Sequence, residues 1–235
     1  KAKIQNQLRL MGYYFSSITG SIEDLGDNKI NLIYQINLGE KSKISKITFT
    51  GDKVYKDKKL RSIIASEEYK FWKFISGRKF LNEQIIELDK RLLKNYYLNN
   101  GYYNAKINTS FAKLISDNSF ELIFNIRANK KYYFNETELK ISDDYSKENF
   151  SKIFSLFKKI KGEPYSINTI DNIVELIDEI VISEQFESIS ASVTEQINDN
   201  KINMIFEVKE SEKFFVERIN IFGNNVTEEK VIRNK

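Results

Sequence analysis

Cysteine and histidine are both absent from this chain of 235 residues. Without cysteine the chain forms neither a disulfide nor a thiolate metal site, and this absence suits oxidising and reducing compartments equally. Without histidine it lacks the commonest general base and the commonest metal ligand. No nucleophile motif or glycine-rich phosphate loop takes their place. We therefore expect no enzymatic activity, no metal and no cofactor.

Other features that the sequence has little of limit the possible architecture. One proline, Pro164, and nine glycines leave no flexible linker, so neighbouring domains should abut directly. The 37 basic and 33 acidic residues are interspersed and give a net charge of +4, which is too balanced to predict a nucleic-acid partner. No apolar run approaches the ~20 residues of a membrane helix. The sequence reads as an excerpt of a longer protein, so the lack of a visible signal peptide carries little weight.

The clearest positive feature is an internal repeat. A helical segment that ends in an aromatic turn and continues into an alternating hairpin occurs three times. The copies read LRLMGYYFSSI from Leu8, KNYYLNNGYYNAKI from Lys94 and, in degenerate form, ISEQFESISASV from Ile182. A second element, KISKITFTGDKVYKDKKLRSII from Lys43, returns as FVERINIFGNNVTEEKVIRNK from Phe215. Such repetition predicts an array of modules of roughly 80–90 residues.

Apolar spacing predicts helices at 56–66, 82–99, 146–159 and 167–182. The helix at 82–99 should begin at an Asn82 cap and bury one stripe. That predicted stripe consists of Ile85, Leu88, Leu92 and Tyr96. Period-two alternation predicts strands with one buried face. The predicted inward rows are Ile30, Leu32, Tyr34 and Ile36; Tyr103, Ala105, Ile107, Thr109 and Phe111; Phe120, Leu122, Phe124 and Ile126; and Ile189, Ala191 and Val193 opposite Ile202, Met204, Phe206 and Val208.

The complete module therefore reads strand–helix–helix–strand–strand. If the first strand runs up, the third also runs up, so it can pair in parallel with the first and antiparallel with the second. The expected fold class is α+β, with tandem β-α-α-β-β modules whose three-stranded mixed sheets are each covered by two helices. This arrangement leaves the second strand at an edge with unpaired backbone groups.

The order and the motifs resemble POTRA (polypeptide-transport-associated) domains, as found in outer-membrane protein assembly factors of the BamA type. The resembling segments are ITFTGDK from Ile47, DKRLLKNYYLNNGYYNAKI from Asp89, FELIFNI from Phe120, INMIFEVKE from Ile202 and INIFGN from Ile219. By this resemblance, residues 1–42 are the back part of a second domain, 43–130 a third and 131–211 a fourth. Residues 212–235 open a fifth.

The resemblance implies a non-enzymatic periplasmic region of a machine that assembles outer-membrane β-barrel proteins. Its partners would be unfolded outer-membrane β-barrel proteins and accessory lipoproteins, and a barrel further along the parent chain would attach it to the membrane. Two alternatives stay open. One is the POTRA region of a related secretion or translocation barrel, and the other is a structural spacer that binds no client.

The edge strand is the first candidate site. An unpaired edge can accept an extended peptide by strand addition, in which main-chain hydrogen bonds give affinity without demanding one sequence. The alternative is a silent edge that charges such as Lys106 and Lys113 protect. The candidate client-binding residues are Tyr103, Asn104, Ala105, Lys106, Ile107, Asn108, Thr109, Phe111, Ile189, Ala191 and Val193.

An aromatic and basic segment, YKFWKFISGRKF from Tyr69, is the second candidate and holds the single tryptophan. Such a segment can contact an accessory subunit, an adjacent domain or lipid headgroups, or it can fold onto its own domain. The candidate interface residues are Phe71, Trp72, Lys73, Phe74, Arg78 and Lys79.

Two further groups of residues are assigned structural roles. The tyrosine pairs Tyr96-Tyr97 and Tyr102-Tyr103 are expected in the core and at domain junctions. The adjacent carboxylates Glu67-Glu68 and Asp143-Asp144 are read as solvated caps. Residues 198–200, Asn-Asp-Asn, are read as a hairpin turn and not as a calcium loop.

Overall fold

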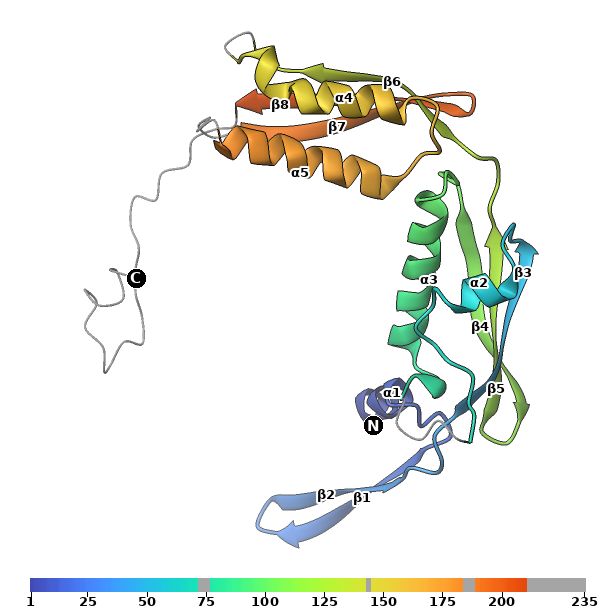
Figure 1. The fold of residues 1–235 in the computed structure, drawn as a ribbon. Coiled ribbons are helices and arrows are strands. Elements are labelled where there is room, and N and C mark those ends of the chain that lie inside the picture. Colours follow the sequence, from blue (N-terminus) through green and yellow to red (C-terminus); the bar gives the residue numbers. More distant parts are fainter. Residues whose placement is uncertain (72–76, 143–144, 184–188, 211–235) are drawn as a thin grey trace.

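The structure, a computed structural model, describes residues 1–71, 77–142, 145–183 and 189–210. A leading segment is followed by a central module and a C-terminal module (Figure 1). The leading segment contains α1 (Ala2–Leu10), β1 (Ser17–Gly26) and β2 (Lys29–Asn37). The central module contains β3 (Lys43–Asp52), α2 (Asp57–Arg61), η1 (Gly77–Lys79), α3 (Glu83–Leu98), β4 (Lys106–Ser116) and β5 (Ser119–Arg127). The C-terminal module contains β6 (Tyr133–Lys140), η2 (Lys147–Phe150), α4 (Ser151–Ile160), α5 (Ile167–Ser183), β7 (Ile189–Asn198) and β8 (Lys201–Glu210).

Both modules have the predicted topology. The strand order is β3-β5-β4 in one sheet and β6-β8-β7 in the other. In each, the last strand lies in the middle, parallel to the first strand and antiparallel to the second. The α+β prediction and the edge position of the second strand are therefore confirmed. None of the described helices is long and apolar enough to cross a membrane.

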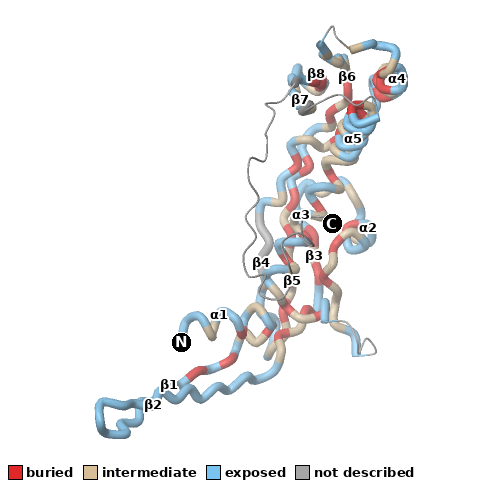
Figure 2. Tube along the Cα trace, turned by 90° about the vertical axis from the view of Figure 1, so that its left-hand side faces the viewer, coloured by how far each residue is buried: buried red, intermediate tan, exposed pale blue. Residues whose placement is uncertain are grey.

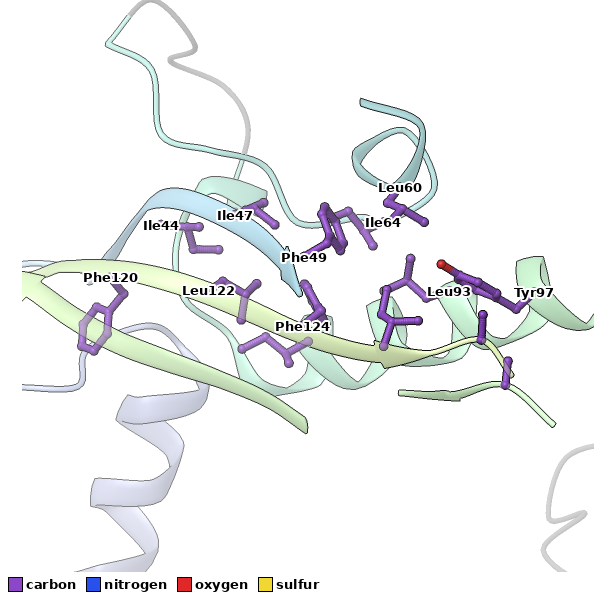
Figure 3. Close-up of a cluster of buried hydrophobic side chains, with 14 of the residues drawn as sticks. Ile44, Ile47, Phe49, Leu60, Ile64, Leu93, Tyr97, Phe120, Leu122 and Phe124 are labelled. Atoms are coloured by element: carbon purple, nitrogen blue, oxygen red, sulfur yellow. The ribbon is translucent and has the colours of Figure 1, made fainter. Parts of the chain in front are cut away.

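The central core lies between the sheet and its helices (Figure 3). On β5 the predicted alternation holds, because Phe120, Leu122, Phe124 and Ile126 are all buried. On β3 the inward residues are Ile44, Ile47 and Phe49, and a register shift between Ile44 and Lys46 explains their uneven spacing. The short α2 adds Leu60 to this core and ends earlier than the predicted 56–66.

Helix α3 begins as predicted but buries a different face. The Asn82 side chain accepts hydrogen bonds from the backbone N–H groups of Gln84 and Ile85, which confirms the cap. The buried residues are Ile86, Asp89, Leu93 and Tyr97, so the predicted stripe of Ile85, Leu88, Leu92 and Tyr96 is wrong by one position. A carboxylate in the middle of the buried stripe concealed it from a search for apolar spacing.

In the C-terminal module the sequence pattern is accurate. Helix α5 covers the predicted range 167–182 and buries Ile170, Ile173, Ile177 and Val181 at helical spacing. Ile202, Met204, Phe206 and Val208 form the matching row on β8. Ala191 and Val193 pack against the same core from β7.

The hairpin of β1 and β2 corrects one expectation. Ile18 is buried at its base, but every residue of β2 is exposed (Figure 2). The row of Ile30, Leu32, Tyr34 and Ile36 was predicted to be buried, yet each side chain is at least 39% exposed. The two strands pair only with each other among the described residues, so no third strand extends this hairpin, and the row stays exposed.

Candidate functional site

The outer edge of β3 is closed by hydrogen bonds. The carbonyl of Ile44 accepts from the backbone N–H of Tyr69 at 2.6 Å. The N–H of Ile47 donates to Glu68 Oε1 at 3.0 Å, and its carbonyl accepts from the Arg61 guanidinium at 2.9 Å. In this part of β3, the Ile44 carbonyl and both backbone groups of Ile47 are therefore unavailable to another strand. Glu68, read from sequence as a solvated cap, is instead a cap on this sheet edge.

The first part of β6 is closed in a comparable way. The N–H of Phe134 donates to the carbonyl of Glu163 at 2.9 Å, and the carbonyl of Phe134 accepts from the N–H of Gly162 at 2.8 Å. The connection between α4 and α5 thus runs along this edge. In both modules, the strand that begins the unit has hydrogen-bonded partners on its outer side.

The opposite edges are open. Within the described residues, no strand pairs with the outer side of β4 or β7. Lys106 to Phe111 of the predicted site lie in β4, whereas Tyr103, Asn104 and Ala105 precede the strand. Ile189, Ala191 and Val193 lie in β7. Two register shifts interrupt β4, between Ile107 and Thr109 and between Leu114 and Ser116. Such bulges are one means by which proteins limit uncontrolled edge pairing.

The first register shift also corrects the predicted face of β4. Ile107 and Ala112 both pack against the central core although they lie five positions apart. Strict alternation would place them on opposite faces, so the bulge after Ile107 changes the phase of the strand. The row predicted from Tyr103 to Phe111 is therefore not one continuous face.

A groove runs between the edge strand and the second helix of each module. The groove beside α3 and β4 has a volume of about 520 Å³, and the groove beside α5 and β7 has about 500 Å³. The first is lined by Tyr14, Leu81, Glu83, Ile86, Glu87, Ala112 and Phe120. The second is lined by Tyr165, Ile167, Ile170, Asp171, Val174, Glu175, Val193 and Glu195. Side chains of an added strand would therefore meet an apolar floor with carboxylates at its rim.

The two junctions between successive units repeat the same backbone hydrogen bonds. At the first junction, the N–H of Ser42 donates to the carbonyl of Gly12 at 2.8 Å, and the N–H of Leu81 donates to the carbonyl of Ser42 at 2.8 Å. At the second, Tyr132 takes the place of Ser42. Its N–H donates to Gly101 at 2.7 Å, and its carbonyl accepts from Tyr165 at 3.0 Å.

The repeated glycines serve these junctions. Gly12 and Gly101 have φ angles of +94° and +92°, a region that side-chain-bearing residues rarely adopt. A Cβ atom at Gly101 would lie 2.8 Å from Lys131 side-chain carbons and 3.1 Å from the carbonyl oxygen of Tyr132. The glycine of the sequence repeat is thus required both by backbone conformation and by the close approach of the linker.

Tyr103 lies at the second junction. Its hydroxyl donates to Glu195 Oε2 at 2.6 Å, and its ring lies 5.0 Å from that of Tyr165. Tyr165 donates to the other oxygen of Glu195 at 2.7 Å. The hydrogen bond to Glu195, together with burial, raises the pKa of Tyr103 to about 12. Burial, with the same carboxylate, also raises the pKa of Tyr165.

The other tyrosines confirm their structural assignment. Tyr97 is fully buried in the central core, and Tyr96 and Tyr102 pack against it. Burial and the neighbouring ring of Tyr55 raise the pKa of Tyr97. The expected hairpin turn at 198–200 is also confirmed, since Asp199 has a φ of +54°. Its Oδ1 lies 2.7 Å from Lys130 Nζ.

The aromatic and basic segment is described only in part. Phe71 is 73% exposed, whereas Lys79 is only 6% exposed. The Lys79 ammonium lies 5.2 Å from the centre of the Tyr69 ring, and that of Lys43 lies 5.1 Å from it. Lys79 therefore belongs to a packed cation–π cluster, while Arg78 is exposed. Trp72, Lys73 and Phe74 lie outside the described residues, as do Asp143 and Asp144.

Among the residues that the structure describes, no group of three or more Asp, Glu, His or Cys side chains could hold a metal ion. The features brought together by the fold are sheet edges, grooves and junction contacts. Two residues in these features, Glu68 at the sheet edge and Glu195 at the junction, were not assigned these roles from the sequence. For Glu195, the sequence offered only its alternating position on β7 as an indication.

These features define a class: tandem modules with one closed and one open sheet edge, joined through glycine-aromatic turns. Residues 42–129 match the family model described as POTRA, surface antigen variable number repeat. The chain is 26% identical over 216 residues to the outer membrane protein assembly factor BamA of Buchnera aphidicola, covering 89% of this chain and 34% of that protein. It is 23% identical over 220 residues to BamA of Neisseria meningitidis, covering 93% and 28% respectively.

The fold agrees with these matches. The crystal structure of Haemophilus influenzae BamA POTRA3-5 superposes with a TM-score of 0.53 at 13% identity, covering 89% of this chain and 78% of that one. Residues 42–129 are thus matched to a POTRA domain, and the chain as a whole is similar to the POTRA region of BamA-type outer-membrane assembly factors. It spans about a third of the length of the curated relatives that it matches.

Proposed function

We propose that this chain is a periplasmic region that binds unfolded outer-membrane β-barrel proteins by strand addition at β4 and β7. The observation that carries this proposal is the asymmetry of each sheet. Glu68, Arg61 and Tyr69 occupy the outer side of β3, whereas β4 offers its backbone groups. Because main-chain hydrogen bonds are common to all peptides, such an edge tolerates clients of many sequences.

In the parent protein, client segments would pass along these edges to a barrel encoded further along the chain, which would also provide the membrane attachment. We propose that residues 1–42 belong to a second POTRA domain, 43–130 to a third, 131–211 to a fourth and 212–235 to a fifth. The exposed row on β2 supports the first assignment, because its alternation of Ile30, Leu32, Tyr34 and Ile36 matches the buried row of β5.

The segment that includes Phe71 is proposed as a docking surface for an accessory lipoprotein of the assembly machine. Phe71 is 73% exposed, and Arg78, seven positions further along the sequence, is also exposed. Aromatic rings and arginine are both enriched in protein interfaces. Trp72, Lys73 and Phe74 would extend this surface.

A structural spacer remains a second candidate, and the junctions favour it. Two backbone hydrogen bonds at each junction, together with the contact between Tyr103 and Glu195, suit a rod that holds a barrel at a fixed distance. A POTRA region of a related secretion barrel would share the same edges and would differ in its clients.

An amide-NMR titration of the chain with a ten-residue peptide from an outer-membrane β-strand separates these functions. We expect chemical-shift changes concentrated on residues 106–116 and 189–198, with Kd values in the weak range typical of coupled folding and binding. No change at millimolar peptide would contradict client binding and favour the spacer.

The matched control is the same peptide with N-methyl groups at alternate backbone nitrogens. N-methylation removes the main-chain donors on one side of the peptide while keeping its side chains. If strand addition is correct, one of the two N-methylation registers should abolish binding and the other should not. Equal binding by the unmodified peptide and by both N-methylated peptides would show that side chains alone drive association.

A further inference from the structure

The two edge grooves occupy equivalent places but carry different charge. Helix α5 contains Asp171, Glu175, Asp178 and Glu179 and no lysine or arginine. Strand β7 likewise carries only Glu195 as a charged residue. The groove between them is therefore bordered by carboxylates from both sides, with no cation on either of its two elements.

In the groove of the central module, the negative charge of the rim carboxylates is partly neutralised. Lys90 Nζ lies 2.9 Å from Glu87 Oε1, so one of its two rim carboxylates is paired. The hydroxyl of Tyr14 donates to the other, Glu83, at 3.4 Å. Strand β4 also carries Lys106 and Lys113, although neither lines the groove. Lys90 thus offsets part of the negative charge here, whereas neither α5 nor β7 carries a cation.

The geometry of the C-terminal groove suits long basic side chains. Asp171 and Glu175 are exposed on α5 and lie one helical turn apart, a rise of about 6 Å. Alternate residues of an extended strand are about 6.6 Å apart, so two side chains on one face of a strand match this spacing. Between the carboxylates and β7 lies a floor that includes Ile170 and Val174. Lysine and arginine can lay their methylene groups on such a floor and place the charge at its rim.

We propose that the groove between α5 and β7 selects extended client segments that carry lysine or arginine at two alternate positions, with Asp171 and Glu175 as the residues that determine this preference. The inference rests on the proposed function, because the segment would be held to β7 by strand addition. Glu195 contributes its charge to the field of the groove, but its oxygens already accept from Tyr103 and Tyr165. The central groove would show no such preference.

The test uses three fluorescent decapeptides and the full chain. The peptides share one alternating apolar sequence and differ at two alternate positions, which hold lysine, glutamine or glutamate. Fluorescence anisotropy gives Kd, and amide NMR reports which edge is occupied. We expect the lysine peptide to bind β7 about three- to tenfold more tightly than the glutamine peptide, with the glutamate peptide weakest. Because the charges are exposed, this preference should shrink at high salt.

Two double variants with equal charge change localise the effect. In Asp171→Asn with Glu175→Gln, the preference for lysine over glutamine at β7 should disappear. In Asp178→Asn with Glu179→Gln, which alters the same helix outside the groove lining, it should persist. Equal loss in both variants, or no preference in the unchanged chain, overturns the inference while leaving strand addition intact. Failure of all three peptides to bind would instead overturn the proposed function itself, and the inference with it.

Discussion

Tyr103 and Glu195 lie 92 positions apart in the sequence, yet the hydroxyl of one donates to the carboxylate of the other at 2.6 Å. Tyr103 ends the aromatic turn of the central module, and Glu195 lies on the edge strand of the next one. Tyr165 donates to the second carboxylate oxygen, so one glutamate holds hydroxyls from both units. The contact thus ties the orientation of the modules to the strand that we propose as a client edge.

Tyr103→Phe tests the strength of this tie. The substitution keeps the ring but removes one hydrogen bond to a charged acceptor, which should cost the closed junction about 1–2 kcal/mol. Residual dipolar couplings of the two sheets measure their relative alignment, and we expect the two alignments to become less alike. Tyr14→Phe is the control, because its hydroxyl makes only a 3.4 Å contact with Glu83. Unchanged couplings in Tyr103→Phe would show that backbone hydrogen bonds alone fix the junction.

The same contact predicts a response to alkali. The pKa of Tyr103 is raised to about 12, whereas an unconstrained tyrosine titrates near 10. A raised pKa means that the folded junction favours the protonated phenol, so its contribution is complete below about pH 10 and is lost as the pH rises through 12. Small-angle scattering should show the chain loosening over this range. Tyr14 and Tyr55 also have pKa values raised to about 12, so the difference between the unchanged chain and Tyr103→Phe isolates this residue.

Gly101→Ala should weaken the second junction. At φ of +92° the new Cβ would be strained and would also meet Lys131 at 2.8 Å, for a combined cost of about 1–3 kcal/mol. Gly162→Ala is a matched control, since its φ is +83° but nothing lies within 4 Å of the added atom. We expect Gly101→Ala to lower the melting temperature more and to speed hydrogen exchange at the N–H of Tyr132. Equal effects of both variants would leave backbone strain as the whole explanation.

The sequence repeat predicted the fold because most core residues of each module recur at the spacing of a strand or of a helix. The row of Phe120, Leu122, Phe124 and Ile126 and the stripe on α5 are instances in which apolar side chains alone mark the buried face. The edge position of the second strand followed from strand directions. These parts of the structure follow from patterns among residues that lie close together in the sequence.

Other parts depend on partners that lie far apart in sequence. The bulge after Ile107, the closure of β3 by Glu68 and the pairing of Tyr103 with Glu195 each require knowledge of which segments meet. A tyrosine after a glycine reads equally well as an edge residue or as a junction residue. Asp89 illustrates the limit most directly, because a charged residue within a buried stripe contradicts the expected pattern until its partners are known.

Those partners are the backbone N–H groups of Ala65 and Ser66, which donate to Asp89 Oδ1 at 2.6 and 3.1 Å. The carboxylate thereby anchors the chain after α2 to helix α3. Asp89 is fully buried, and among the described residues its Oδ2 has no hydrogen-bond partner. Burial raises the pKa of Asp89, and the hydrogen bonds from Ser66 and Ala65 oppose that rise. The folded state therefore accepts the desolvation of a carboxyl group at the position that holds this loop.

Asp89→Asn should be at least as stable as the unchanged chain at pH 7. Asparagine keeps the acceptor oxygen and removes the buried ionisable group, and its amide N–H can donate to Ser66 Oγ, which has no hydrogen-bond partner among the described residues. Asp89→Ala leaves two backbone donors unsatisfied and should cost about 2–4 kcal/mol. Urea unfolding across pH values measures both effects.

Because the folded pKa of Asp89 is raised, its contribution favours folding at low pH and declines as the pH rises through that pKa. This pH dependence of the unfolding free energy should vanish in Asp89→Asn. If the asparagine variant were as unstable as the alanine variant, the charge of Asp89 and not its acceptor oxygen would hold the loop.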